Sequence, residues 1–178
     1  MIITKAFLEK HGACADAYDW YLEQKTTDGD KLFKAAMKAK MYNEIWWTLR
    51  RKLNKKQSVK IAIYAAEQVI DIFEKKYPND IRPRKAIQAV KKYLKNPTDK
   101  AFSHVLQSAV AAHAAAASAR NPAAIYASCA AASVIGDIYG DPINHADHAA
   151  LIAPTRGLYK TNKIKILRYA WRVLNDNA

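Results

Sequence analysis

Basic side chains are the residues of this sequence with the clearest chemical potential, and they gather in three segments. Residues 31–60 carry ten Lys or Arg against Glu44 alone, and residues 75–100 carry nine against two acids. Residues 156–172 carry six and no acid. The net charge of +13 is therefore concentrated in these segments. Such a field favours anionic partners and speeds encounter with them, although it says little about the fold.

The middle segment contains a strongly basic stretch, PNDIRPRKAIQAVKKYLKN, at residues 78–96. Pro83 falls in the first turn of a helix, where its missing N–H costs nothing. Apolar residues then recur at helical spacing, so the charged residues project away from the apolar stripe. The two arginines have a competing structural role, because arginines that flank a helix start often hold the preceding turn. We predict that the leading contacts with a partner are Arg82, Arg84, Lys85, Lys91, Lys92 and Lys95.

Two further basic faces are expected on other helices. In YNEIWWTLRRKL, Trp46 fits the apolar stripe, whereas Trp47 follows it directly and therefore points off that stripe. Trp47 is the best candidate for an exposed aromatic side chain beside basic groups. The cations next to it, which rank second as partner contacts, are Arg50, Arg51 and Lys52. A last helix, from Thr161 to about Leu174, turns three more cations outward, namely Lys165, Arg168 and Arg172.

Three interpretations of these basic faces stay open. They are solvated helix exteriors that keep the protein soluble, contacts to the phosphates of nucleic acid, or a docking surface for an acidic protein. Nucleic-acid binding requires several cations in register and a steep salt dependence, and no helix-turn-helix, zinc finger or RNA-binding signature marks it here. Docking onto an acidic protein uses charge for encounter rate and specificity.

Histidines provide the next candidates. His145 and His148 stand three apart, a spacing that places two imidazoles on one helix face as a metal site needs. No Cys or carboxylate cluster nearby completes a ligand set, so packing is the favoured interpretation and no metal is expected. His113, inside an alanine-rich helix, is expected to be buried and hydrogen-bonded. The alternative is a pocket for anionic nucleotides, lined by His113, Tyr126 or Arg120.

Motifs for catalysis are absent from the sequence. No G-x-S-x-G elbow, phosphate-binding glycine loop or dinucleotide fingerprint occurs, and carboxylates are few. We therefore expect a protein that is not an enzyme and has no cofactor. Cys14 and Cys129 fit buried small hydrophobes, and with no disulfide framework a reduced cytoplasm is the default location. No apolar run approaches the ~18 residues of a membrane span, so no membrane partner is expected.

Helical periodicity dominates the chain, and strand-like alternation never persists. The first helix is expected from Thr4 to about His11, with Gly12 as its stop. A second follows over ACADAYDWYLEQ, in which Tyr18, Tyr21 and Leu22 recur at helical spacing, and a third begins near Asp28 or Asp30.

The centre of the chain is expected to pack most tightly. A long helix with Ser58 as N-cap is predicted to run up to Pro78. Alanine-rich helices over 98–120 and 122–139 allow close approach, and a short helix from His145 to Ile152 follows. The prediction is an all-α protein, a single helical bundle of about eight to ten helices that forms one domain over residues 1–178.

Two stretches carry a resemblance to a known family. They are YAAEQVIDIFEKKYPNDIRPRKAIQAVKKYLKNP (64–97) and AVAAHAAAASARNPAAIYASCAAASVIGDIYGDPINHADHAAL (109–151). Together they resemble a family of bacterial immunity proteins whose members also occur in phages, and the segment RPRKAI (82–87) is the most specific part. The resemblance implies an all-helical cytosolic protein that binds and neutralises a toxin or a host defence effector. The basic ending TRGLYKTNKIKILRYAWRVL (155–174) departs from the alanine-rich ending expected of that family.

Overall fold

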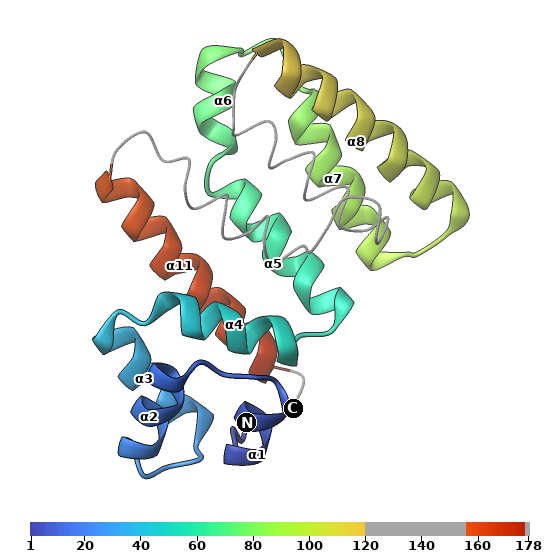
Figure 1. Cartoon of the computed structure of the whole chain (residues 1–178). Helices are drawn as coiled ribbons and strands as arrows, with labels where there is room; N and C mark the ends of the chain where they lie inside the picture. The colour runs from blue at the N-terminus through green and yellow to red at the C-terminus, as the bar shows by residue number, and fades with distance from the viewer. Residues whose placement is uncertain (120–155, 177–178) are drawn as a thin grey trace. The chain divides into compact units, whose positions relative to one another are not determined.

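The computed structural model describes residues 1–119 and 156–176, and these residues are almost entirely α-helical (Figure 1). Within them, the pairing between extended segments is limited to an isolated bridge between Ile2 and Asp28. The all-α prediction is therefore confirmed. The chain divides into two compact units: unit 1 is Met1–Lys52 with Leu174–Ala178, and unit 2 is Leu53–Val173. The expectation of one domain stays a prediction.

Unit 1 contains four short helices, two of which have side-chain N-caps. The Thr4 side chain accepts a hydrogen bond from the Phe7 N–H, and Gly12 has a left-handed φ of 67° just after the helix end. Asp28 caps the third helix. The predicted bounds for these helices hold closely. The helices are α1 (Lys5–Lys10), α2 (Ala15–Glu23), α3 (Gly29–Ala39) and α4 (Tyr42–Lys52).

One expectation about the start of α2 is wrong. Cys14 is exposed instead of buried, because it occupies the N-cap position at the start of α2. Leu22 is 46% exposed, whereas its neighbour Tyr21 is buried and donates a hydrogen bond to the Ile3 carbonyl. A nine-residue helix packs only a narrow stripe, so the position next to the buried Tyr21 remains in solvent.

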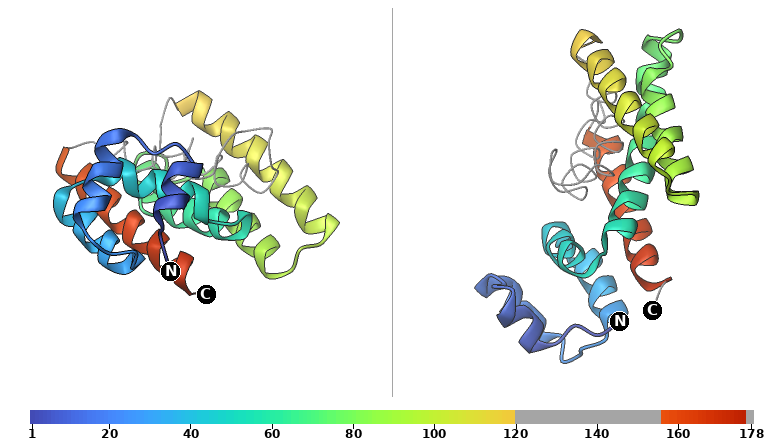
Figure 2. Two further views of the ribbon diagram at one scale, coloured as in Figure 1. Left: turned by 60° about the horizontal axis from the view of Figure 1, so that its bottom comes forward. Right: turned by 90° about the vertical axis from the view of Figure 1, so that its right-hand side faces the viewer.

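Unit 2 contains the longer helices, and its core lies among four of them. Phe73, Val90 and Val105 are fully buried there, together with Ala112. The small side chains on one face of α8 let it lie against α7, as both views of Figure 2 show. The helices are α5 (Lys55–Glu67), α6 (Ile70–Lys76), α7 (Arg82–Lys95), α8 (Asp99–Ala119) and α11 (Arg156–Asn175).

The long helix predicted from Ser58 to Pro78 is wrong in two respects. It starts earlier, because Asn54 and Gln57 form a reciprocal capping box, and Ser58 is a buried residue inside the helix. It is also two helices, because Val69 leaves helical dihedral angles (φ −125°, ψ −12°) between α5 and α6. Apolar spacing continues through this break, so periodicity does not reveal it.

Several predictions lie outside the described residues. They concern the helices over 122–139 and from His145 to Ile152, and the packing of Cys129. In the described part of the chain, none of the helices is long and apolar enough to cross a membrane.

The capping box gives a direct test of where α5 begins. We expect Asn54→Ala to lower the free energy of unfolding by about 1 kcal/mol, because an N3 amide loses its acceptor. Urea denaturation measures this difference. Ser58→Ala is the matched control and should cost clearly less, since the hydroxyl caps nothing. The opposite ranking would show that the helix begins at Ser58.

Candidate partner-binding surface

Helix α7 presents its cations in two groups because of the side that it buries. Ala86, Ile87 and Val90 are no more than 2% exposed and fix the inner side of the helix. Pro83 is buried in the first turn, as the sequence predicts. Cations beside the buried stripe reach the neighbouring helices, and those opposite it reach solvent. The two groups therefore have different roles.

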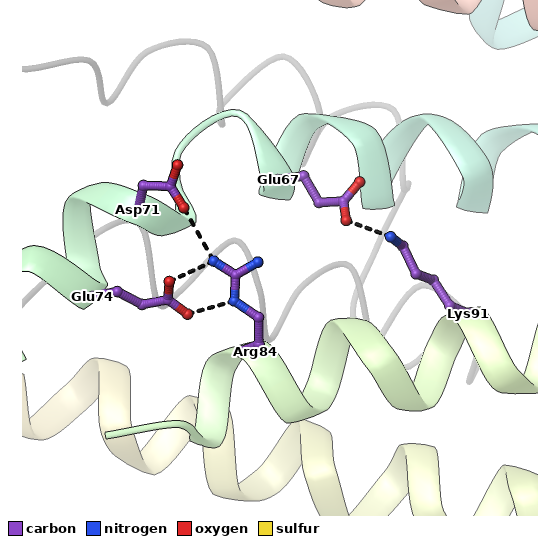
Figure 3. Close-up of polar contacts among 5 residues, drawn as sticks. All are labelled: Glu67, Asp71, Glu74, Arg84 and Lys91. Atoms are coloured by element: carbon purple, nitrogen blue, oxygen red, sulfur yellow. Dashed lines mark hydrogen bonds and ion pairs between the residues drawn. The ribbon is translucent and has the colours of Figure 1, made fainter. Parts of the chain in front are cut away.

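Arg84 and Lys91 belong to the first group and pair with carboxylates of α5 and α6 (Figure 3). Arg84 donates to both carboxylate oxygens of Glu74 and, over 3.0 Å, to Asp71. Lys91, seven residues along the same side of α7, pairs with Glu67. The carboxylates at 67, 71 and 74 likewise share one side of their helices. We call these contacts the ion-pair ladder; they raise the pKa of Arg84, above all through Glu74.

Arg82 holds the turn before α7. Its guanidinium donates to both carboxylate oxygens of Asp80 over 2.8 and 2.7 Å, and its backbone N–H donates to the same side chain over 3.2 Å. The side-chain bonds from Arg82 hold the pKa of Asp80 below its ordinary value. The competing structural role expected for Arg82 and Arg84 is therefore present in the structure.

The second group on α7 is free of such pairing. Lys85, Lys92 and Lys95 are exposed and, among the described residues, have no ion pair with any carboxylate. Their spacing of seven and three places them on one outer side of the helix. We call these three lysines the α7 row. Of the six predicted contacts on this helix, three are therefore paired with acids and three have no acid partner among the described residues; all six remain predictions.

Helix α11 carries a second exposed row in unit 2. Lys165, Arg168 and Arg172 lie in solvent at helical spacing, as predicted. No ion pair with a carboxylate is found for them in the described part of the chain. The guanidinium of Arg172 lies 5.7 Å from the ring centroid of Tyr169 on the same helix. We call these three residues the α11 row.

Helix α5 connects the two rows. Tyr64 of α5 stacks on Tyr169 of α11, with ring centroids 4.0 Å apart, while Glu67 of α5 pairs with Lys91 of α7. Tyr169 lies within electrostatic range of Arg172, Glu67 and Lys91, and burial raises the pKa of Tyr169. The sequence analysis missed both tyrosines as site residues, because no local pattern indicates that α5 and α11 are neighbours.

The third predicted group lies in unit 1 and is built on aromatic rings. The Arg51 guanidinium lies 3.9 Å from the ring centroid of Trp47 and donates to the Trp47 carbonyl. Phe7 meets Trp47 edge to face, and Lys52 lies 4.1 Å from the Phe7 ring centroid. Arg50 is exposed. Trp47 therefore does lie beside basic groups, but its ring is half-buried and engaged by its neighbours.

The net charge is distributed unevenly between the units. Residues 53–173 contain 19 Lys or Arg and 8 Asp or Glu, whereas the remaining residues contain 10 and 8. Nearly all of the net charge of +13 therefore belongs to unit 2. Its exposed, unpaired cations in the two rows form the best candidate for a surface that meets an anionic partner.

Of the predictions about histidines, the structure tests the one about His113. His113 is exposed on α8, so the expectation of a buried, hydrogen-bonded histidine is wrong; the helix buries the alanines on its other side. The other members of the suggested nucleotide pocket, Arg120 and Tyr126, lie outside the described residues, as do His145 and His148. Within the described residues, no group of three or more His, Cys, Asp or Glu is placed to hold a metal ion.

Comparison with known proteins gives one finding. The family model described as "Imm-5 like putative immunity protein" matches residues 49–156. This range includes α5, α6, α7 and α8, and with them the ion-pair ladder and the α7 row. Searches of curated proteins and of solved structures found no match.

The ion-pair ladder predicts a difference between adjacent cations of α7. We expect Arg84→Gln to lower the free energy of unfolding by about 1 kcal/mol, because two carboxylates lose their partner at a partly exposed site. The matched control Lys85→Gln should change it by less than about 0.5 kcal/mol. Urea denaturation at low salt measures both. Equal effects would show that Arg84 does not brace α6.

The Arg82–Asp80 pair predicts a pH-dependent part of the stability. Because the folded pKa of Asp80 is lowered, this part is present above the ordinary value of 3.8 and is lost as pH falls through the lowered pKa. We expect Asp80→Asn to be less stable than wild type at pH 6, with a difference that shrinks towards pH 2. Thermal denaturation against pH measures this. A pH-independent difference would contradict the role of the charge.

Proposed function

Because the chain belongs to the Imm-5 like putative immunity protein family, which has an immunity-type role, we propose that it neutralises a toxin or a host defence effector by binding it. The partner is a protein with an acidic surface, and the basic surface of unit 2 contacts it. The chain acts by occupying the partner, without catalysis and in the cytoplasm. Its free, exposed Cys14 is compatible with a reducing compartment.

The α7 row is the observation that carries this proposal. Arg84 and Lys91 on the same helix are matched with carboxylates, whereas Lys85, Lys92 and Lys95 are exposed and have no carboxylate partner in the described ranges 1–119 and 156–176. Three like charges on one helix side repel each other weakly, and an acidic partner surface relieves that repulsion. The row also lies within the residues that the family model matches.

The remaining candidate contacts rank behind the α7 row. The α11 row shares unit 2 with it but begins after the matched residues end at 156. Trp47, Arg50, Arg51 and Lys52 belong to unit 1, where cations and acids are nearly balanced. We propose that the α11 row extends the contact surface and that the unit 1 group contributes to encounter.

Growth rescue tests the proposal. The chain is co-expressed in a bacterial host with a panel of toxin domains, and we expect it to restore growth against at least one of them and to form a stoichiometric complex with it. The triple variant Lys85→Glu, Lys92→Glu and Lys95→Glu should abolish rescue. Reversing three exposed cations at ~1 kcal/mol each weakens binding roughly 100-fold.

A second lysine row provides the matched control. Lys31, Lys34 and Lys38 are exposed on α3 in unit 1 with the same kind of helical spacing. Changing all three to Glu alters net charge equally and should leave rescue intact. If both triple variants lose rescue equally, only net charge matters. If wild type rescues no toxin but retards duplex DNA at physiological salt, the nucleic-acid alternative is correct.

A further inference from the structure

A stacked tyrosine pair, Tyr64 of α5 and Tyr169 of α11, joins these two helices. The Tyr64 and Tyr169 rings are nearly parallel, with an interplanar angle of 10° and centroids 4.0 Å apart. Both side chains are half-buried. Tyrosine has only two side-chain torsions, and mutual stacking restricts them further. The pair is therefore ordered before any partner arrives, which lowers the entropy cost of binding.

Both phenol hydroxyls are available to a ligand. Among the described residues, neither the Tyr64 nor the Tyr169 hydroxyl has a hydrogen-bond partner. Each side chain is only half-buried, and burial raises the pKa of the Tyr169 phenol.

The charges around the pair favour an anionic group. Arg172 lies 5.7 Å from the Tyr169 ring centroid and has no carboxylate partner among the described residues. Glu67, the acid near Tyr169, is held by Lys91. Two phenols and a guanidinium thus lie in one patch, and all three are hydrogen-bond donors. Tyrosine and arginine are also the residues in which the binding energy of protein interfaces concentrates.

The neighbouring ladder indicates the class of the partner. Helix α5 touches α11 through the tyrosine pair and α7 through Glu67, so carboxylates lie between the α11 row and the α7 row. A continuous polyanion such as nucleic acid that spans both rows passes Glu67 and the largely exposed Asp71. A folded protein places its carboxylates at separate points and avoids them.

We infer that Tyr64, Tyr169 and Arg172 form an anchor that binds one carboxylate side chain of the protein partner. This inference rests on the proposed function and adds to it the chemical group that the partner inserts. The phenols donate to the carboxylate oxygens, while the Arg172 guanidinium supplies charge and a planar pair of donors. The α7 row then contacts other acids of the same partner surface.

NMR of ¹³C-tyrosine-labelled protein tests the anchor without knowledge of the partner. The probe is the side-chain carboxylate of N-acetyl-glutamate N-methylamide. We expect the Tyr64 and Tyr169 ring signals to shift and saturate with a Kd of about 1 mM. The isosteric N-acetyl-glutamine N-methylamide should shift neither signal. No shift, or equal shifts with both probes, would overturn the inference.

Matched variants locate the binding groups. Arg172→Lys keeps the charge but loses the planar pair of donors, and it should raise the Kd about tenfold, whereas Arg168→Lys on the same row should not. Tyr64→Phe should raise the Kd for the glutamate probe about fivefold, because one hydrogen bond is lost. The Tyr169 ring signal reports this Kd in the variant. The control Tyr93→Phe, on α7, should have no effect. Equal losses for both arginine variants would show charge attraction alone and overturn the inference.

Two further arms separate this inference from the proposed function. Suppose that the chain restores growth against a toxin, that the triple change in the α7 row abolishes this rescue, and that Tyr64→Phe combined with Tyr169→Phe does not. The anchor is then wrong and the proposed function stands. If the glutamate probe binds as expected but the chain restores growth against no toxin, the proposed function is wrong and the carboxylate site stands. A 20-base-pair duplex that shifts the same tyrosine signals at lower concentration at physiological salt would overturn the inference in favour of nucleic acid.

Discussion

The ion pairs that Arg84 and Lys91 make with carboxylates of α5 and α6 determine how unit 2 displays its charge (Figure 3). Each pair neutralises a cation on the side of α7 that faces its neighbours. The exposed lysines at 85, 92 and 95 have no ion pair with an acid in the described part of the chain. Along α7, paired and unpaired cations thereby alternate within the described residues.

This alternation matters for recognition more than the total charge does. A net charge of +13 attracts any anion over a long range. Paired carboxylates close to cations that have no acid partner in the described part of the chain instead favour partners whose acids are placed in a complementary way. The tyrosines at 64 and 169 add rigid contact area and two hydroxyl donors to the same face. Long-range attraction and short-range selection can thus be separated on one surface.

Local sequence patterns predicted the helices well and their neighbours poorly. Pro83 in the first turn of α7, the Thr4 cap and the outward cations of α11 all follow from rules that act within a few residues. The pairing of Arg84 with Glu74 and the stacking of Tyr64 on Tyr169 depend on which helices meet, and no short pattern encodes that.

The errors have more than one origin. His113 is exposed because α8 buries the alanines on its other side, and Cys14 is exposed because it is the N-cap residue before α2. The start of α5 before Ser58 could have been predicted from the sequence, because Asn54 and Gln57 have the spacing of a capping box. The break after Gln68 was not readable, because neither glycine nor proline marks it and the apolar spacing is continuous.

The break between α5 and α6 gives α7 a structural role. Glu67 is the last residue of α5, before the break, whereas Asp71 and Glu74 belong to α6, after it. Helix α7 forms ion pairs with all three carboxylates, through Lys91 and Arg84. Helix α7 therefore bridges the break, because its ion pairs hold both α5 and α6.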